Sequence, residues 1–172
     1  DSVSKRYSLC GARVGCIVSK NKGLIKNVLK FAHLRLSPPT YALIASEAAL
    51  SASDSYLENV VAEYSKRKNV LIEALEKIPD VKVSRPMGAF YCIVKLPVDD
   101  AETFSRFLLT SHQHKGQTVM LAPATGFYSS PGVGKNQVRI AFVLESKKLL
   151  RAVKIIELGI RAYKKMNTQT FV

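Results

Sequence analysis

The sequence predicts an α/β chain in three parts. Three observations carry this prediction: a short apolar strand near the start, a long helical stripe in the middle, and a block of short strands and helices after it. Residues 1–53 are typical of the end of a larger α/β layer, residues 54–79 predict a linking helix, and residues 80–172 predict a smaller α+β domain. Hydrophobic residues make up 47% of the 172 residues and charged residues 23%, as in a globular protein.

The first part combines one strand with two helices. Residues 13–19 are mostly apolar and predict a short strand of the buried kind. Asn21 is placed to cap a helix with an apolar stripe. Ser37-Pro38-Pro39 ends that helix, because proline cannot donate a backbone hydrogen bond. Residues 40–52 then predict an alanine-rich helix.

A long helix follows. Ser55 and Glu58 have the spacing of a capping box at its start, and Pro79 sets its end. A helix of about 24 residues is about 36 Å long, which is enough to bridge two domains.

The last part alternates strands and helices. Asp99 or Asp100 is placed to cap one helix that runs to about His112, and a closing helix runs from Ser146 to about Lys165. Gly132-Val133-Gly134-Lys135 lacks the spacing of a phosphate loop and predicts a turn. The predicted strands are residues 81–83, 89–95, 118–122 and 138–144, and a long loop covers residues 124–135.

Composition excludes several classes of function. The formal charge is +13 at pH 7, but the basic residues are scattered and no nucleic-acid-binding motif is present, so we expect no nucleic-acid partner. No apolar run approaches the length of about 20 residues that spans a bilayer, so we expect no membrane partner. Three cysteines and three histidines lack the spacing of metal ligands, so we expect no metal. Sparse free thiols suit a reducing compartment, which predicts a cytoplasmic location.

The stretch from Ser2 to Gly15 carries the first candidate chemistry. Lys5 follows two serines, and Arg13 lies between Gly11 and Gly15. A lysine amine can form an imine with a carbonyl, and an arginine offers a planar fork of donors to a phosphate. Together with the serine hydroxyls, these groups suit a phosphorylated aldehyde cofactor. A polar loop with solvated Lys5 and Arg13 is the alternative that these residues alone leave open.

Two further stretches add candidate groups. Gly88-Ala89-Phe90-Tyr91 places an aromatic pair at a strand start, where Phe90 either lines a ligand pocket or faces the core. Arg139 lies on an otherwise apolar strand, on the face opposite Val138 and Ile140. It therefore needs an anionic partner, which is either a structural carboxylate or the carboxylate of a substrate.

Taken in order, these stretches resemble the class I/II aminotransferases, which are fold-type I enzymes that use pyridoxal 5'-phosphate. The resemblance rests on Ser-x-Ser-Lys with Gly-x-Arg-x-Gly, Ser-Pro-Pro before a helix, Gly-Ala-Phe-Tyr, and Asn136 with Val-Arg-Ile-Ala-Phe. It runs over essentially the whole chain and is strongest toward aspartate aminotransferases.

The resemblance implies a role for each matched residue. Lys5 is similar to the catalytic lysine that binds the cofactor covalently and moves a proton at the substrate α-carbon. Ser2 and Arg13 match the family's phosphate-binding serine and arginine, and Arg139 matches the arginine that binds the substrate α-carboxylate. Arg35 lies nearer to Pro38 than the corresponding arginine of some aspartate-specific members, so we interpret it as a solvated arginine at a helix end.

The resemblance also implies which part of an enzyme this is. It makes residues 1–53 the C-terminal remnant of the large cofactor-binding domain, with the linking helix and the small domain after it. The complete enzyme is expected to be a homodimer that exchanges the amino group between aspartate and 2-oxoglutarate, and this chain alone is expected to be inactive. The alternatives are a non-catalytic structural or assembly module, and another reaction of the same cofactor, decarboxylation or elimination.

An incomplete sheet has a physical consequence. Without its neighbours, the predicted strand at residues 13–19 exposes unpaired backbone groups and apolar side chains. We therefore expect the isolated chain to associate through this region or to leave it poorly ordered.

Overall fold

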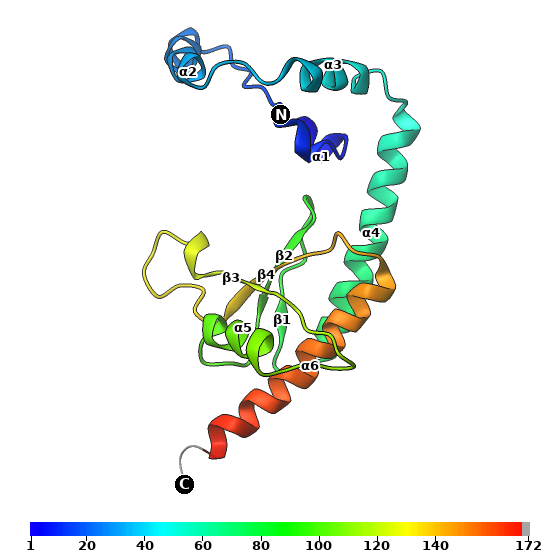
Figure 1. Cartoon of the computed structure of the whole chain (residues 1–172), viewed down its shortest axis with the longest axis vertical. Coiled ribbons are helices and arrows are strands. Elements are labelled where there is room, and N and C mark those ends of the chain that lie inside the picture. Colours follow the sequence, from blue (N-terminus) through cyan, green and yellow to red (C-terminus); the bar gives the residue numbers. More distant parts are fainter. Residues whose placement is uncertain (170–172) are drawn as a thin grey trace. The chain divides into compact units, whose positions relative to one another are not determined.

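The computed structural model describes residues 1–169 and separates into two units, Asp1–Val61 and Ala62–Val172. Helix α4, Asp54–Glu76, crosses the boundary between them (Figure 1). The division into a large-domain remnant, a linking helix and a small domain stays a prediction.

The first unit is helical. Its elements are α1 (Val3–Arg6), the 3-10 turn η1 (Cys10–Ala12), α2 (Lys22–Arg35) and α3 (Thr40–Ala49), followed by the start of α4. Asn21 caps α2 as predicted, because its side-chain oxygen accepts a hydrogen bond of 3.0 Å from the backbone N–H of Leu24. The helix ends before the two prolines, which confirms that boundary.

The predicted strand at residues 13–19 is wrong. Gly15 forms one isolated antiparallel bridge with Ser2, and residues 16–19 belong to no strand. Ile17 is 62% exposed and Val18 88% exposed. A strand needs a neighbour along its length to accept and donate backbone hydrogen bonds, and the pairing with the start of the chain reaches only to Cys16.

The predicted capping box of α4 is also wrong. The helix begins at Asp54, so Ser55 lies inside it, and the Ser55 hydroxyl lies 2.8 Å from the hydroxyl of Ser53. The end of α4 at Glu76, three residues before Pro79, agrees with the prediction.

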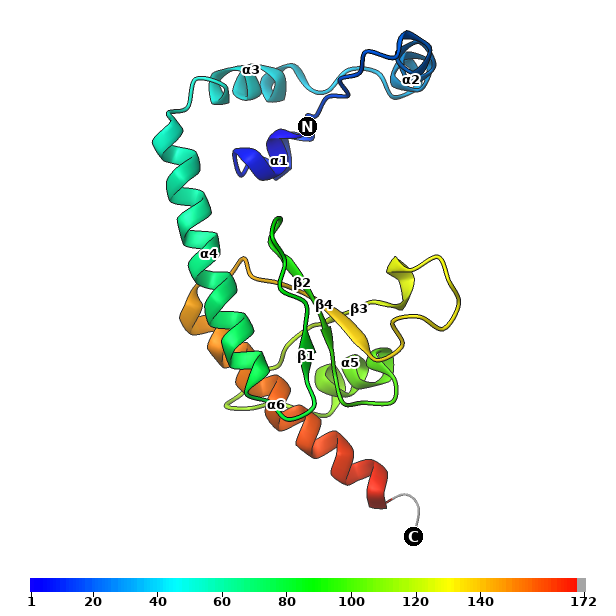
Figure 2. The same ribbon diagram turned by 180° about the vertical axis from the view of Figure 1, so that it is seen from behind.

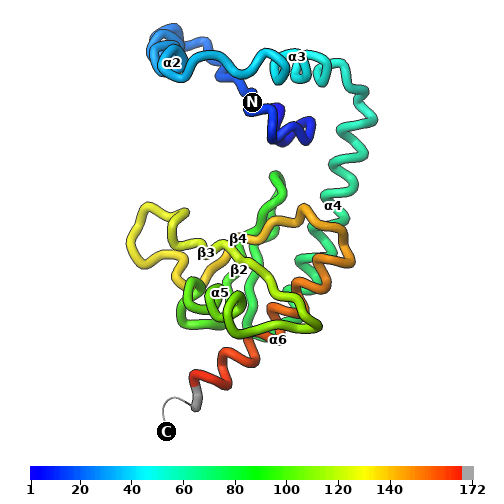
Figure 3. Tube along the Cα trace, in the orientation of Figure 1, coloured from blue at the N-terminus to red at the C-terminus, as the bar shows by residue number. Residues whose placement is uncertain are grey.

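The second unit contains an antiparallel sheet in the order β1-β2-β4-β3. Its elements are β1 (Lys82–Val83), β2 (Tyr91–Lys95), α5 (Ala101–Thr110), β3 (Ala122–Pro123), the 3-10 turn η2 (Thr125–Phe127), β4 (Gln137–Ala141) and α6 (Ser146–Gln169). β1, β2 and β4 overlap the predicted strands and are shorter, whereas β3 shares only Ala122 with the strand predicted at residues 118–122, which is otherwise wrong. Figure 3 shows the loop that leaves β3 and returns to β4. Within this loop Gly134 has a φ of 79°, and residues 131–136 form turns, as predicted.

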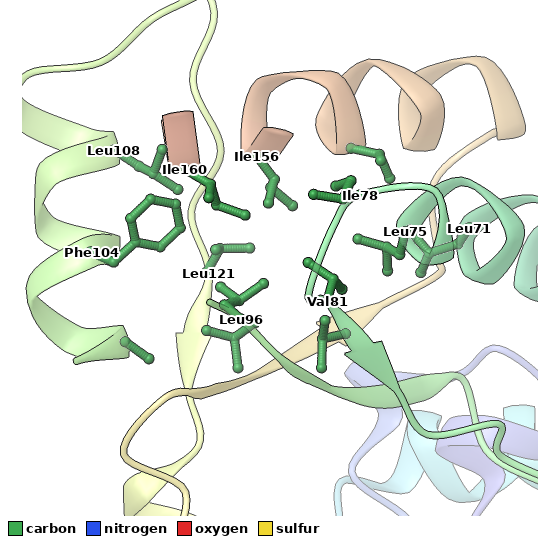
Figure 4. Packing of buried hydrophobic residues seen from close by; sticks show 14 of the residues in the cluster. Leu71, Leu75, Ile78, Val81, Leu96, Phe104, Leu108, Leu121, Ile156 and Ile160 are labelled. Carbon is green, nitrogen blue, oxygen red and sulfur yellow. The ribbon is translucent and has the colours of Figure 1, made fainter. Parts of the chain in front are cut away.

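The core of this unit lies on one face of the sheet. Cys92, Val94 and Val138 point from the strands into a buried cluster that Leu75 of α4 and Phe104 of α5 also enter. Residues of α5, α6 and the end of α4 meet there in Figure 4. Burial of each such side chain stabilises the fold by about 1.5–3 kcal/mol.

Two helices of the core lie beside each other. Figure 2, seen from behind, shows the C-terminal half of α4 next to the N-terminal half of α6, and Leu71 and Leu149 belong to the same buried cluster. The three helices thus cover one face of the sheet, and the side chains of the opposite face, Tyr91, Ile93 and Arg139, are only half-buried.

Candidate functional site

Ser2 organises the N-terminal segment of the first unit. It has an extended backbone and caps α1, because its hydroxyl oxygen accepts a hydrogen bond of 3.2 Å from the N–H of Ser4. The same hydroxyl lies 3.3 Å from the carbonyl oxygen of Val14, to which it donates. One hydroxyl therefore links the helix that carries Lys5 to the segment that follows Arg13.

Backbone hydrogen bonds reinforce this link. The N–H of Val3 donates to the carbonyl of Val14 at 3.3 Å, and the N–H of Cys16 donates to the carbonyl of Asp1 at 2.9 Å. Since Lys5 lies two residues after Val3 and Arg13 directly precedes Val14, the pairing joins the two candidate residues across a short antiparallel contact.

Arg13 has an unusual backbone and a charge that stays available. Its φ of 56° and ψ of 35° are left-handed, which is uncommon for a residue other than glycine. Its Nη1 donates to the carbonyl of Cys10 at 3.2 Å. Among residues 1–169 the structure gives its guanidinium no acidic partner, so its charge is not neutralised within the described chain.

Two hollows border this segment. One of about 460 Å³ is lined by Ser2, and one of about 760 Å³ is lined by Arg13 and Arg35. Both are lined by Gly15, and neither by Lys5, whose side chain is exposed on α1. The structure thus joins Ser2, Lys5 and Arg13 through the backbone, and neither of these two hollows is lined by all three. Arg35 is the exposed last residue of α2, as expected.

Arg139 belongs to the second unit and lies between two aromatic rings. Its Cζ is 4.7 Å from the centre of the Tyr91 ring and 4.3 Å from the centre of the Phe127 ring. No carboxylate of the described chain lies within ion-pair distance of it. The structural carboxylate that the sequence left open as its partner is therefore not found among residues 1–169.

Phe90 packs against the core of the second unit. Its ring centre lies 5.6 Å from that of Tyr64 and 4.6 Å from that of Tyr91, and it packs against the buried cluster.

Phe127, the second ring on Arg139, was not identified from the sequence. It lies in the long loop predicted at residues 124–135. An aromatic residue after a glycine in a loop is too weak a signal to have identified it.

Other reactive groups in the described chain do not add to the site. Burial raises the pKa of the Cys92 thiol to about 11, so it stays protonated. Residues 1–169 contain no cluster of histidine, cysteine and acidic side chains that could hold a metal ion. They also contain no helix with the length and apolarity to cross a membrane.

Comparison with known proteins decides the family. The family model for aminotransferase class I and II matches residues 1–156. The chain belongs to this family. It is 28% identical over 169 residues to an aspartate aminotransferase of Pyrococcus horikoshii, a match that covers 95% of this chain and 41% of that protein. It is 32% identical over 154 residues to an aspartate aminotransferase of Thermotoga maritima, covering 90% of this chain and 37% of that one.

Solved structures agree with this assignment. The crystal structure of an aspartate aminotransferase from Thermotoga maritima matches with a TM-score of 0.74 at 29% identity, over 93% of this chain and 39% of that one. A second match is LysN, an α-aminoadipate aminotransferase from Thermus thermophilus that was solved with N-(5'-phosphopyridoxyl)-L-leucine. It has a TM-score of 0.80 at 23% identity, covers 96% of this chain and 42% of that one, and supports the fold.

These matches confirm the predicted resemblance and the predicted fold, an α/β part of a fold-type I transferase. They also confirm pyridoxal 5'-phosphate as the cofactor of the family. The chain spans about two fifths of the length of the curated relatives it matches.

Proposed function

We propose that this chain is the C-terminal part of a pyridoxal-phosphate-dependent aminotransferase that exchanges the amino group between aspartate and 2-oxoglutarate. The observation that carries the proposal is the pairing of residues 1–3 with residues 14–16, which joins the Lys5 helix to Arg13. The aspartate aminotransferases among the relatives, at 28% and 32% identity, support the choice of substrate.

The donors of the N-terminal segment fit the cofactor. An amine, a hydroxyl and a guanidinium are the groups that bind an aldehyde and a phosphate, and the Arg13 guanidinium has no acidic partner among the described residues. Lys5 would bind the aldehyde carbon through Nζ, and the Ser2 hydroxyl and the Arg13 guanidinium would bind the phosphate oxygens. When bound, the cofactor supplies the ring that withdraws electrons from the substrate α-carbon.

Proton transfer and substrate binding are the proposed roles of Lys5 and Arg139. In its neutral form Lys5 Nζ would accept the proton that leaves the substrate α-carbon and would deliver it to the carbon of the cofactor's aldehyde group. Arg139 binds the α-carboxylate with two parallel N–H donors, which fixes the orientation of the α-carbon. Arg35, exposed and beside the same hollow as Arg13, has no role in this proposal.

A second candidate, a non-catalytic structural or assembly module, is favoured by one observation. The chain covers only 37–41% of the length of its relatives, so a complete active site is not expected from it alone. Decarboxylation or elimination with the same cofactor remains the alternative reaction. For the complete enzyme we propose a cytoplasmic homodimer.

Replacement of Lys5 by alanine in the complete enzyme tests the proposal. The variant is expected to lose the visible absorbance of the lysine-bound cofactor and at least about a hundredfold in turnover. Lys26→Ala, an exposed lysine of α2, is the matched control and should keep both. A complete enzyme that shows no such absorbance with pyridoxal phosphate would refute the cofactor assignment, and a panel of amino acids identifies the substrate.

A further inference from the structure

Two aromatic rings contact the Arg139 guanidinium, and no carboxylate of the described chain lies within ion-pair distance of it. We propose that Phe127 and Tyr91 are positioning residues that clamp the Arg139 guanidinium and present its edge to the substrate carboxylate. The proposal rests on the carboxylate-binding role of Arg139 proposed above. Neither ring is proposed to contact the substrate.

The sheet register places the first ring. On the antiparallel strands β2 and β4, Tyr91 lies opposite Ala141, and Ile93 lies opposite Arg139. Tyr91 is therefore the diagonal neighbour of Arg139 on the same face of the sheet, a spacing that long and aromatic side chains can bridge. On its other side Arg139 lies opposite Ala122 of β3, whose small side chain adds little bulk next to the guanidinium.

Two tethers place the second ring. The N–H of Ala124 donates to the carbonyl of Gln137 at 2.9 Å, and the hydroxyl of Tyr128 donates to the side-chain oxygen of Gln137 at 2.6 Å. Phe127 lies between these two points in η2, and Gln137 lies two residues before Arg139 on β4. These hydrogen bonds fix the loop that carries Phe127 to β4, the strand that carries Arg139.

The exposure of Phe127 agrees with a role other than core packing. Its side chain is 51% exposed, so apolar burial explains little of its position. Its ring centre lies 4.3 Å from Arg139 Cζ, which is within the range of a cation–π contact.

Rings and carboxylates constrain an arginine differently. A carboxylate occupies the N–H donors at the edge of the guanidinium and neutralises its charge. Rings contact its faces, restrict its rotation and leave both the donors and the charge available. A clamped arginine is therefore ready to bind a carboxylate in the plane of the guanidinium.

The clamp can be tested on the 172-residue chain by NMR of ¹⁵N-labelled arginine. The Nε–Hε signal of Arg139 should lie upfield because of the two rings, and it should shift on titration with succinate. Phe127→Ala should move the signal toward that of a solvent-exposed arginine and weaken succinate binding by about two- to fivefold, the range of an exposed cation–π contact. Phe127→Tyr should restore both, and the thermal midpoint should change little in either variant.

The controls separate the clamp from the role of Arg139. Arg139→Lys removes the reporting signal, so its succinate binding is measured by calorimetry and should be lost. Tyr41→Ala, at an 88% exposed tyrosine of the first unit, should change neither the signal nor the binding. Equal succinate affinity with and without the Phe127 ring would overturn the clamp and leave the carboxylate role of Arg139 standing. If succinate shifted the Arg139 signal neither in the 172-residue chain nor in the complete enzyme, both proposals would be overturned. A signal without an upfield shift would overturn the clamp before any variant is made.

Discussion

Two glycines in the loop before β4 have the same backbone conformation but different surroundings. Gly132 has a φ of 77° and Gly134 a φ of 79°. A Cβ on Gly132 would meet no atom within 4 Å, whereas one on Gly134 would lie 2.6 Å from Cε2 of Tyr128 and 3.3 Å from the backbone of Ala124. The ring of Tyr128 is held by its hydrogen bond to Gln137, so it cannot move away without breaking the tether of the loop.

The two glycines therefore form a matched pair for mutation. Gly132→Ala is expected to lower the free energy of unfolding by about 1–2 kcal/mol, the cost of a side chain in the left-handed region. Gly134→Ala is expected to lower it by about 1–3 kcal/mol more, because the new methyl group clashes with the ring. Urea denaturation of both variants measures the difference, and equal losses would contradict the tight packing of Tyr128 on Gly134.

The three cysteines are expected to differ in reactivity because they differ in burial. Cys10 and Cys16 are exposed, and Cys92 is buried with its pKa raised to about 11. Because the thiolate is the reactive form, a thiol reagent at pH 8 is expected to label Cys10 and Cys16 in the folded chain and Cys92 only after unfolding in urea. Mass spectrometry of the labelled peptides checks this. Fast labelling of Cys92 in the folded chain would show that the core of the second unit opens easily.

Helix α5 depends on one carboxylate at its N-terminus. Of the two candidates, Asp100 is the cap, since its Oδ1 accepts a hydrogen bond of 2.7 Å from the N–H of Thr103, while Asp99 accepts one from the hydroxyl of Tyr163. The Thr103 N–H favours the ionised carboxylate and lowers the pKa of Asp100 below its ordinary value of 3.8. A lowered pKa in the folded state gives stability that is present above pH 3.8 and is lost as the pH falls through the folded value.

Substitution of Asp100 separates the cap from its charge. Asp100→Ala is expected to cost about 1 kcal/mol of the free energy of unfolding at pH 7, because the N–H of Thr103 loses its acceptor. Asp100→Asn keeps an acceptor that does not titrate, so its stability relative to the unsubstituted chain should rise as the pH falls from 7 to 2. Thermal or urea unfolding across this range measures it. A constant difference between Asp100→Asn and the unsubstituted chain would contradict the lowered pKa.

Prediction from sequence succeeded for elements whose determinants are local. The cap at Asn21, the prolines after α2, the cap at Asp100 and the stripe of α6 all lie within or next to the element that they define. The strand at residues 13–19 failed because strand formation depends on a partner elsewhere in space, which the sequence pattern cannot supply. The capping box failed because the helix already begins at Asp54, which places Ser55 inside it.

The candidate site also contains residues that are close in sequence and residues that only tertiary contacts bring together. Ser2, Lys5 and Arg13 lie within a stretch of twelve residues whose groups suit a phosphorylated aldehyde, but these residues alone left a solvated loop open, and only the family resemblance implied their roles. The partner of Arg139 was not predictable, because Phe127 reaches it through a loop whose path is set by hydrogen bonds to Gln137. Residues brought together by such tertiary contacts leave no periodic signal in the sequence.

At the scale of the whole molecule, the first unit exposes many large apolar side chains. Phe31 is 70% exposed, Leu34 82% and Leu36 80%, and all three lie in or directly after α2. Ile17 and Val18 add an apolar segment that no strand of the described chain covers. Large apolar side chains that are exposed in this number are typical of an interaction surface.

The isolated chain is therefore expected to associate as its concentration rises, through the apolar surface of the first unit. Sedimentation velocity over a hundredfold range of concentration should show a rising mean mass, and Leu34→Glu with Leu36→Glu should reduce it, because a buried unpaired carboxylate opposes association. Met87→Glu, at a fully exposed methionine of the second unit, is the matched control and should leave the association unchanged. Amide hydrogen exchange adds a second readout, in which residues 17–19 should be protected only at concentrations where the chain associates. A chain that stays monomeric at every concentration with these amides fully protected would show that the exposed segment is stable without a partner.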